Sequence, residues 1–314
     1  PPHRSEKIEK ILKIRQLKAF FVVFGENIKV SSMFLRRATK RIMSFGQTVR
    51  RSVGLAGENK QYLREKFKSL GEGDVLFEKL EYQGHNIAII SLANPKNRNA
   101  LSGKMMVKLA EIVDELQDWH VGKAVILKGV EKTFCSGADL AVAKRILSHE
   151  EGEMMSTLMH DTVLRIKYLP FLSVAVVEGL ALGGGAELLL CCDFRLARSN
   201  AVIQFVQARM GVTPGWGGAA QLVDFVGKRE ALKTLASSKK IHPTQALDMG
   251  LVDEIIPQDT ADVQNAVCDW LLPYLKPPPT VIHATKKCVM GNMKPLEDSL
   301  EFERYTAVAH VQLV

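Results

Sequence analysis

The residues best suited to chemistry lie near the middle of the chain, where three glycines precede Ala, Glu and Leu at positions 183–188. They follow a strand-like run at 172–177 and lead into a helix-like run that ends near Cys192. Glycines at such a junction let a ligand approach bare backbone, and the first turn of a helix leaves its N–H groups unpaired. Glu187 stands in an apolar run, where a charge is costly unless it has a partner or a task. The pattern indicates an oxyanion-stabilising site beside a tuned carboxylate.

A second glycine-containing loop can supply the other half of such a site. Residues 134–140 (FCSGADL) follow a buried-type strand at 123–128. One backbone N–H from each loop, converging on a single oxygen, makes an oxyanion hole, in which one donor is worth roughly 2.7–4 kcal/mol of transition-state stabilisation. Each loop alone is a weak signal, because a glycine run is most often only a tight turn.

Strands and helices alternate around these loops. Residues 75–82 and 87–92 read as a hairpin, and Ser102 can cap a helix whose apolar residues follow helical spacing. The next helices are expected at about 140–149 and 153–168, and the next strands at 172–177 and 193–198. Strand–strand–helix units that give way to helices indicate an α/β fold with a helical finish.

Several short motifs occur in order along the chain. They are NPKNRNAL at 94–101, FCSGADL at 134–140, ALGGGAEL at 181–188, CDFR at 192–195 and PGWGG at 214–218. As an ordered set, this sequence from about Val75 to Val308 resembles the crotonase (enoyl-CoA hydratase/isomerase) superfamily. The resemblance implies a crotonase-like spiral of ββα units with a C-terminal helical trimerisation region. It also implies an acyl-coenzyme A ligand, no separate cofactor and no metal site.

The same resemblance implies roles for particular residues. Ala138 and Gly184 would supply the oxyanion-hole amides, and Glu187 would be the catalytic carboxylate. Lys96 and Arg98 would meet the phosphates of coenzyme A, although each could also be ordinary solvated loop charge. The other residues expected at the ligand are Ala100, Leu101, Asp139, Leu140, Gly183, Gln207 and Trp216.

Some polar and aromatic residues have a simpler structural interpretation. Trp216 could wall the acyl pocket or plug the core from a loop. Asp139 could only fix its own loop through hydrogen bonds. His120 and His160 are expected at the surface or in satisfied hydrogen bonds rather than in catalysis.

Position 207 limits the reactions that such a site can run. A hydratase of this superfamily uses two carboxylates, and the second would fall four residues before Gly211, where this chain has Gln207. A carboxamide cannot act as a general base at neutral pH. One carboxylate suits decarboxylation, in which a 2-carboxyacyl thioester loses CO2 and the two amides hold the enolate oxygen. Glu187, with its pKa raised by apolar neighbours, would position the substrate or deliver a proton.

We therefore expect a carboxy-lyase acting on 2-carboxyacyl-CoA thioesters. The resemblance further implies ethylmalonyl-CoA as the preferred substrate, methylmalonyl-CoA as a slower one, and a role in metabolite repair. One alternative is an enoyl-CoA hydratase or isomerase of fatty-acid metabolism, and Gln207 argues against its hydratase form. The other alternative is a catalytically inactive binding protein of the same fold. Gln207 also stands where the resemblance leads us to expect a histidine.

Basic residues are concentrated near the N-terminal end. Residues 1–57 hold 13 Lys and Arg against 3 Glu, a net charge of +10; the remaining 29 basic and 31 acidic residues give −2, within the overall +8. The near-neutral remainder argues against a nucleic-acid partner, and no apolar run approaches the ~20 residues that cross a bilayer. We expect a basic disordered leader over 1–70, a core over 71–272 and C-terminal helices over 273–314 that are apparently truncated.

Different observations bear on the cellular compartment and on the oligomeric state. The acid-free segment 27–57 suits a mitochondrial presequence or a disordered tail equally well. The five cysteines have no zinc spacing, which favours a reducing compartment and five small core side chains. The cytosol is the expected compartment, with the mitochondrial matrix as the alternative, and the resemblance implies a homotrimer or hexamer.

Overall fold

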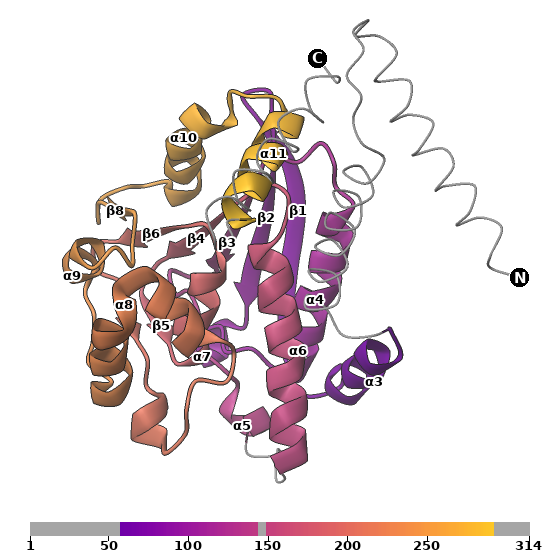
Figure 1. The fold of residues 1–314 in the computed structure, drawn as a ribbon, viewed down its shortest axis with the longest axis vertical. Helices are drawn as coiled ribbons and strands as arrows, with labels where there is room; N and C mark the ends of the chain where they lie inside the picture. The colour runs from indigo at the N-terminus through magenta and orange to yellow at the C-terminus, as the bar shows by residue number, and fades with distance from the viewer. Residues whose placement is uncertain (1–56, 144–148, 292–314) are drawn as a thin grey trace, which may run out of the picture. The chain divides into compact units, whose positions relative to one another are not determined.

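The main sheet has six strands in the computed structural model, which describes residues 57–143 and 149–291 (Figure 1). Their order is β1 (Asp74–Tyr82), β2 (His85–Ala93), β3 (Ala124–Gly129), β4 (Leu172–Val177), β6 (Phe194–Arg198) and β8 (Glu254–Ile256). β1 pairs antiparallel with β2, and all later pairings in this sheet are parallel. The α/β fold class predicted from the sequence is confirmed.

The first two strands form the predicted hairpin. Its turn consists of Gln83 and Gly84, with φ angles of 48° and 77°. Positive φ at both central positions matches the right-handed twist of the flanking strands. β2, β3 and β4 are buried over almost their whole length, as parallel strands covered on both faces must be.

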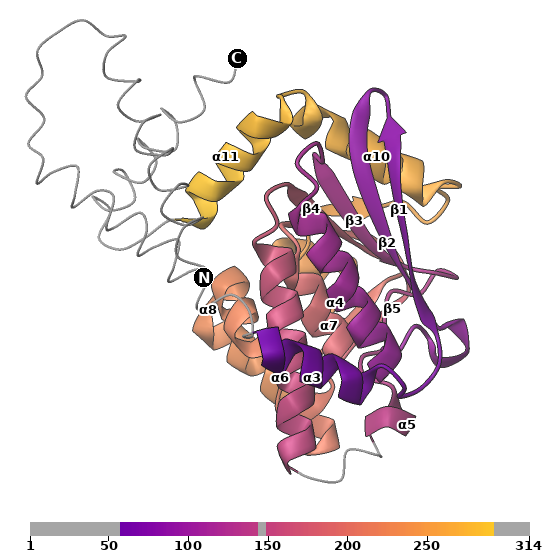
Figure 2. The same cartoon turned by 90° about the vertical axis from the view of Figure 1, so that its right-hand side faces the viewer.

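Two hydrophobic clusters lie on the two faces of this sheet. In β2, Ala88 and Ile90 belong to the cluster that includes helices α4 and α6, whereas Ile87 and Ile89 belong to the cluster that includes α10. The bounds of these helices are α4 (Gly103–Gln117), α6 (His149–Lys167) and α10 (Val263–Leu275). α4 and α6 lie side by side (Figure 2). Successive side chains of a strand point to opposite faces of the sheet, so alternate residues belong to different hydrophobic clusters.

A second set of short pairings links the loops that follow the main strands. β5 (Leu180–Leu182) pairs in parallel with β7 (Val202–Gln204), and isolated bridges join Leu101 to Ala138 and Cys135 to Ala181. Main strand, short strand and helix then recur as β4, β5 and α7 (Gly184–Leu188), and as β6, β7 and α8 (Gly218–Ser237). These are the expected ββα units. The remaining short helices are η1 (Pro95–Asn97), α5 (Leu140–Ala143), η2 (Leu189–Cys191), η3 (Gln207–Met210) and α9 (Pro243–Asp248).

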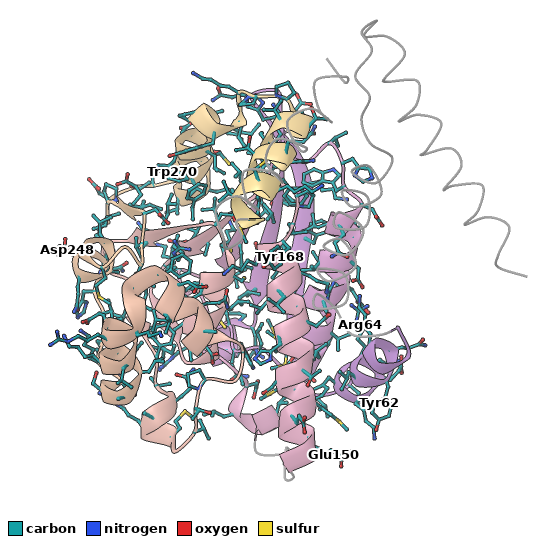
Figure 3. The ribbon with its side chains drawn as sticks, viewed as in Figure 1. Tyr62, Arg64, Glu150, Tyr168, Asp248 and Trp270 are labelled. Atoms are coloured by element: carbon teal, nitrogen blue, oxygen red, sulfur yellow. The ribbon has the colours of Figure 1, made fainter. Side chains whose placement is uncertain are left out.

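The leader boundary expected at residue 70 needs correction, because helix α3 (Gly57–Phe67) lies inside it. Leu63 and Phe67 of α3 are buried. Figure 3 shows Arg64 on the side of α3 that faces α4 and Tyr62 on the opposite side; Arg64 donates to the carbonyl of Ala110 on α4 at 3.2 Å. The last part of the expected leader is therefore a packed helix. The rest of the expected leader, 1–56, falls outside the described residues, as do 144–148 and 292–314.

Asp114 of α4 forms ion pairs that connect α3 to the core. Its carboxylate accepts from Lys60 at 2.5 Å, Arg64 at 2.7 Å and the buried Arg165 of α6 at 2.6 Å. Burial raises the pKa of Asp114, but the bonds from Lys60 and Arg64 and the nearby guanidinium charges outweigh burial and hold it below its ordinary value.

Asp114→Asn is therefore expected to lower the free energy of unfolding by about 1–2 kcal/mol at neutral pH, since the carboxylate is one third exposed. A depressed carboxyl pKa stabilises the fold above the unfolded pKa, and this stabilisation is lost as pH falls through the folded pKa. Urea unfolding at pH 7 and at pH 3 should show a larger difference at pH 7. Asp118→Asn, at the exposed end of α4, is the control, and an equal loss at both pH values would contradict the assignment.

The boundary expected between residues 272 and 273 also needs correction. It falls inside α10, whose Val267, Leu271 and Leu275 are buried beneath the sheet. A run of prolines separates α10 from α11 (Pro279–Met290), which still packs on the core through the buried Ile282 and Lys286. All five cysteines are free, and four are buried as expected, but Cys288 of α11 is partly exposed.

Candidate active site

Backbone hydrogen bonds fix the orientation of the loop at residues 134–140. Leu101 donates its N–H to the carbonyl of Gly137 at 2.8 Å, and Asp139 donates its N–H to the carbonyl of Leu101 at 2.9 Å. Because Leu101 bonds both neighbours of Ala138 in this parallel bridge, the N–H of Ala138 points away from Leu101. The loop thus presents one main-chain donor on its free side.

The second glycine loop contacts the first directly. A Cβ placed on Gly137 would lie 3.0 Å from the nitrogen of Gly184, and a Cβ placed on Gly185 would lie 2.1 Å from the carbonyl oxygen of Cys135. Only residues without a side chain allow this approach, and the φ of +99° at Gly137 also favours glycine. The two segments that carry Ala138 and Gly184 therefore pack backbone to backbone.

The amides of Ala138 and Gly184 are both available to a ligand. Gly184 is the first residue of α7, a position that has no intrahelical acceptor. Among the backbone hydrogen bonds of residues 57–143 and 149–291, none is donated by either amide. Both residues are half-buried. Unpaired main-chain donors away from bulk water are rare, and two in adjacent segments suit an anionic oxygen. The structure packs against each other the two segments that carry these amides.

Glu187 is 2% exposed, and its carboxylate accepts four hydrogen bonds. Oε1 accepts from Gln207 Nε2 at 2.7 Å and from the N–H of Gly215 at 3.3 Å. Oε2 accepts from the N–H groups of Trp216 and Gly218, each at 2.8 Å. Burial raises the pKa of Glu187, and the four donated bonds oppose this rise without cancelling it. The carboxylate is both a group with a perturbed pKa and the anchor of the loop at 214–218.

Trp216 packs against the second loop. Its side chain is 3% exposed, and a Cβ on Gly184 would lie 2.5–2.8 Å from three carbons of its six-membered ring. The indole therefore covers Gly184 closely, while the backbone N–H of Trp216 donates to Glu187. Both interpretations of Trp216 apply in part, because the ring is buried and also adjoins the proposed oxygen-binding amide.

The two candidate phosphate-binding side chains are exposed beside the loop at 134–140. Lys96 lies in η1 and Arg98 follows it in the left-handed conformation. Ser136 fixes this segment by donating its N–H to the carbonyl of Arg98 at 3.0 Å and its hydroxyl to the carbonyl of Asn97 at 2.9 Å. The hydrogen bonds and ion pairs found among the described residues include no side-chain partner for Lys96 or Arg98.

The remaining expected ligand residues are placed differently. Ala100 and Leu101 are buried, so their backbone and not their side chains can face a ligand. Asp139 is also buried and accepts from Asn97 Nδ2 at 3.0 Å, which agrees with a loop-fixing role. Leu140 is 59% exposed, and Gly183 uses its N–H within the protein by donating to the carbonyl of Gln204 at 2.9 Å.

The sequence did not reveal what surrounds Glu187. The amides of Gly215, Trp216 and Gly218 all donate to it, and a Cβ on Gly218 would lie 2.4 Å from the Glu187 side chain. The available signal was the dense glycine run after Pro214, which suggests close backbone approach but not its target. Within the described part of the chain, no three His, Cys, Asp or Glu side chains gather as a metal site would require.

Comparisons with known proteins give named relatives. The ethylmalonyl-CoA decarboxylase of Danio rerio is 45% identical over 247 residues, which cover 77% of this chain and 81% of that protein. The protein of the same name from Xenopus tropicalis is 42% identical over 249 residues, covering 79% and 82%. The one from Mus musculus is 36% identical over 296 residues, covering 92% and 90%.

Solved structures and a family model agree on the fold. An enoyl-CoA hydratase from Bacillus anthracis superposes with a TM-score of 0.70 at 24% identity, covering 76% of this chain and 91% of that one. An enoyl-CoA hydratase from Thermoplasma volcanium gives 0.67 at 24% identity, covering 76% and 92%. At this identity the likeness shows the fold alone. The family model described as enoyl-CoA hydratase/isomerase matches residues 82–310. This chain belongs to the enoyl-CoA hydratase/isomerase family, the crotonase superfamily that its ordered motifs resemble.

Proposed function

We propose that this protein is a carboxy-lyase that removes CO2 from 2-carboxyacyl-CoA thioesters, ethylmalonyl-CoA first and methylmalonyl-CoA more slowly. The observation that carries the proposal is that the buried carboxylate of Glu187 is paired with the carboxamide of Gln207 and not with a second carboxylate. Relatives named ethylmalonyl-CoA decarboxylase, 36% to 45% identical to this chain, support it. The proposed role is metabolite repair, and it needs no cofactor beyond the coenzyme A of the substrate.

The two free amides perform the first step. The thioester oxygen accepts hydrogen bonds from the N–H groups of Ala138 and Gly184. The bond between Cα and the free carboxylate breaks, CO2 leaves, and the electron pair moves into the thioester to give an enolate. Each donor placed where this charge develops is worth roughly 2.7–4 kcal/mol. No base is required in this step.

Glu187 supplies the second step. The enolate takes a proton at Cα, and burial favours the protonated form of Glu187 by raising its pKa above the ordinary value. After the transfer Glu187 is a carboxylate, and its four donors are ready to stabilise it. A proton from solvent restores the acid.

Hydration is disfavoured at the same site. Adding water across a double bond needs a group that removes a proton from the water, and a carboxamide has no basic lone pair for this task. Gln207 is also committed to Glu187 at 2.7 Å. The hydratase and isomerase alternatives therefore rank below decarboxylation.

A substrate panel tests the proposed function. Purified protein is incubated with ethylmalonyl-CoA, methylmalonyl-CoA and crotonyl-CoA, with CO2 release and loss of enoyl absorbance followed in parallel. We expect CO2 from the first substrate, less from the second, and no hydration of the third. Hydration of crotonyl-CoA without CO2 release from either malonyl thioester would overturn the proposal in favour of a hydratase.

Lys96 and Arg98 are proposed to bind the phosphates of coenzyme A. Replacing both with alanine should raise KM by about 5–30-fold and leave kcat unchanged, because the lost contacts are equal in ground and transition states. The KM effect should shrink at high ionic strength. Lys108→Ala, an exposed lysine on α4, is the control. A loss of kcat at unchanged KM would contradict phosphate binding.

Assembly and compartment are finer proposals. None of the helices in the described ranges combines the length and apolarity that crossing a membrane would need. We propose a homotrimer or hexamer that acts in the cytosol, with the mitochondrial matrix as the alternative. Light scattering would test the first point. Imaging of fluorescent fusions with and without residues 27–57 would test the second.

A further inference from the structure

The four partners of the Glu187 carboxylate are not equivalent. Three of them are the backbone N–H groups of Gly215, Trp216 and Gly218. A backbone N–H only donates, and its direction is fixed by the chain. The fourth partner, Gln207, is a side-chain carboxamide that carries a donor and an acceptor on one rotatable group.

A proton on Glu187 changes what the site requires. A protonated carboxyl group has an O–H that must find an acceptor, and a buried O–H without one is costly. The three backbone partners cannot supply an acceptor. Gln207 can, because a 180° turn of its carboxamide replaces Nε2 with Oε1 opposite Glu187 Oε1.

Gln207 has the atom that this turn would use. The side chain is 7% exposed, and its Oε1 is buried without a hydrogen-bond partner in the structure. The orientation with Nε2 toward Glu187 is the one that an ionised carboxylate demands, since a carboxylate can only accept. While Glu187 is ionised, Gln207 Oε1 therefore has no hydrogen-bond donor. After the turn, the O–H of protonated Glu187 would donate to it.

We propose that the Gln207 carboxamide turns over when Glu187 gains or loses its proton, and that Gln207 thereby places the proton on Oε1. Gln207 is then a positioning residue, because it acts through Glu187. The catalytic use of this turn rests on the proposed function, in which Glu187 is the acid that protonates the enolate. The turn itself concerns two side chains of the free protein.

The proton balance is simple. In the free protein a solvent proton binds Glu187 Oε1, the bond from Gln207 Nε2 breaks, and a new bond from Glu187 O–H to Gln207 Oε1 forms. In turnover the Glu187 O–H bond breaks as the enolate carbon takes the proton. The carboxamide turns back, and Nε2 again donates to the carboxylate.

The elements packed around this pair carry several other titratable groups. They include Cys135, Cys191 in η2, Arg209 on η3, His160, Asp161 and Arg165 on α6, and Asp224, Lys228, Arg229, Glu230 and Lys233 on α8. The causes of the shift in the Glu187 pKa are burial and its four hydrogen bonds, and none of these charged groups. Burial raises the pKa of Cys135 to about 12 and that of Cys191 as well, so both thiols stay neutral. His160 is exposed, and its Cδ2 lies 3.8 Å from the position of a Cβ on Gly217. Because other titratable groups lie near the pair, the readout must be specific for Glu187 and Gln207.

Magnetic resonance of the full chain supplies that readout. The side-chain NH2 signal of Gln207 is assigned by its loss in Gln207→Met, and the carboxyl carbon of Glu187 by its loss in Glu187→Gln. We expect both signals to titrate with the same midpoint in the wild-type protein. We also expect that midpoint to be unmoved by His160→Gln. A Gln207 NH2 signal that stays constant while Glu187 titrates would overturn the turning carboxamide.

Variants distinguish a turning carboxamide from a fixed donor. Gln207→Met keeps the length of the side chain but neither donates nor accepts. If the carboxamide turns in the wild-type protein, Gln207→Met removes one hydrogen bond from both the ionised and the protonated form of Glu187. The titration midpoint of Glu187 then moves by less than about one pH unit. A fixed donor stabilises only the carboxylate, and its loss would raise the midpoint by about one unit or more. Gln207→His, which can donate or accept through its two tautomers, should restore kcat relative to Gln207→Met.

The two proposals fail separately. Joint titration of Glu187 and Gln207 in a protein that releases no CO2 from the substrate panel would support the turning carboxamide and refute the decarboxylase. CO2 release with an invariant Gln207 signal would do the reverse. The wild-type titration itself measures both groups in the unaltered protein.

Discussion

Glu187→Gln is expected to lower kcat/KM for ethylmalonyl-CoA by about 10²–10⁴-fold. The substituted carboxamide has nearly the same shape but cannot hold or deliver an acidic proton. The loss should appear in kcat, because the thioester oxygen still meets the amides of Ala138 and Gly184. Steady-state kinetics of CO2 release measures the effect.

The same substitution has a second, structural cost. A carboxamide at 187 has an NH2 group in place of one carboxylate oxygen, and this group cannot accept hydrogen bonds from the N–H groups that face it. The loop at 214–218 therefore loses part of its hydrogen bonding to residue 187. We expect the free energy of unfolding to fall by about 2–4 kcal/mol. Glu111→Gln, on the exposed side of α4, is the matched control. Full turnover by a folded Glu187→Gln protein would eliminate Glu187 as the acid.

Gly137→Ala is expected to lower kcat by about 10²–10³-fold, the effect of one missing oxyanion donor. The new methyl would lie 3.0 Å from both the nitrogen of Gly184 and the carbonyl oxygen of Leu182. It would push the two loops apart at the point where their amides must share one oxygen. KM should change little, because the coenzyme A contacts lie elsewhere.

Gly84→Ala provides the control for backbone strain. Gly84 has a φ of +77°, similar in kind to the +99° of Gly137, but a Cβ there meets nothing within 4 Å. Both variants should lose about 1 kcal/mol of stability from the left-handed backbone. Only Gly137→Ala should lose turnover. Equal kcat values for the two variants would show that the contact between the loops is not needed for catalysis.

Local patterns in the sequence were sufficient for most elements. The strand predicted at 172–177 is β4 without change, and Ser102 caps α4 by accepting from the N–H of Met105 at 3.2 Å. These features depend on residues close together in the chain, so propensity and capping rules reach them. The predicted helix at 140–149 is described only as far as Ala143.

Features that depend on distant residues were missed or misplaced. Helix α3 has few apolar residues, and its polar contacts are with Asp114 and the carbonyl of Ala110, far along the chain. The donors around Glu187 come from residues 207–218, and no periodicity in either segment predicts that they meet. The sequence indicated the residue types at the site, whereas the hydrogen bonds between them required the folded chain. The catalytic roles of Ala138, Gly184 and Glu187 stay predictions until turnover is measured.

The short pairings of Leu101 with Ala138 and of Cys135 with Ala181 have a kinetic consequence. Each joins segments separated by a complete helix or strand. The chain must therefore lose the entropy of loop closure before the contact stabilises it. The oxygen-binding amides cannot acquire their relative position from either segment alone. Catalytic competence is therefore a late property of the folding chain, and a compact intermediate with its helices already formed would still be unable to stabilise an enolate.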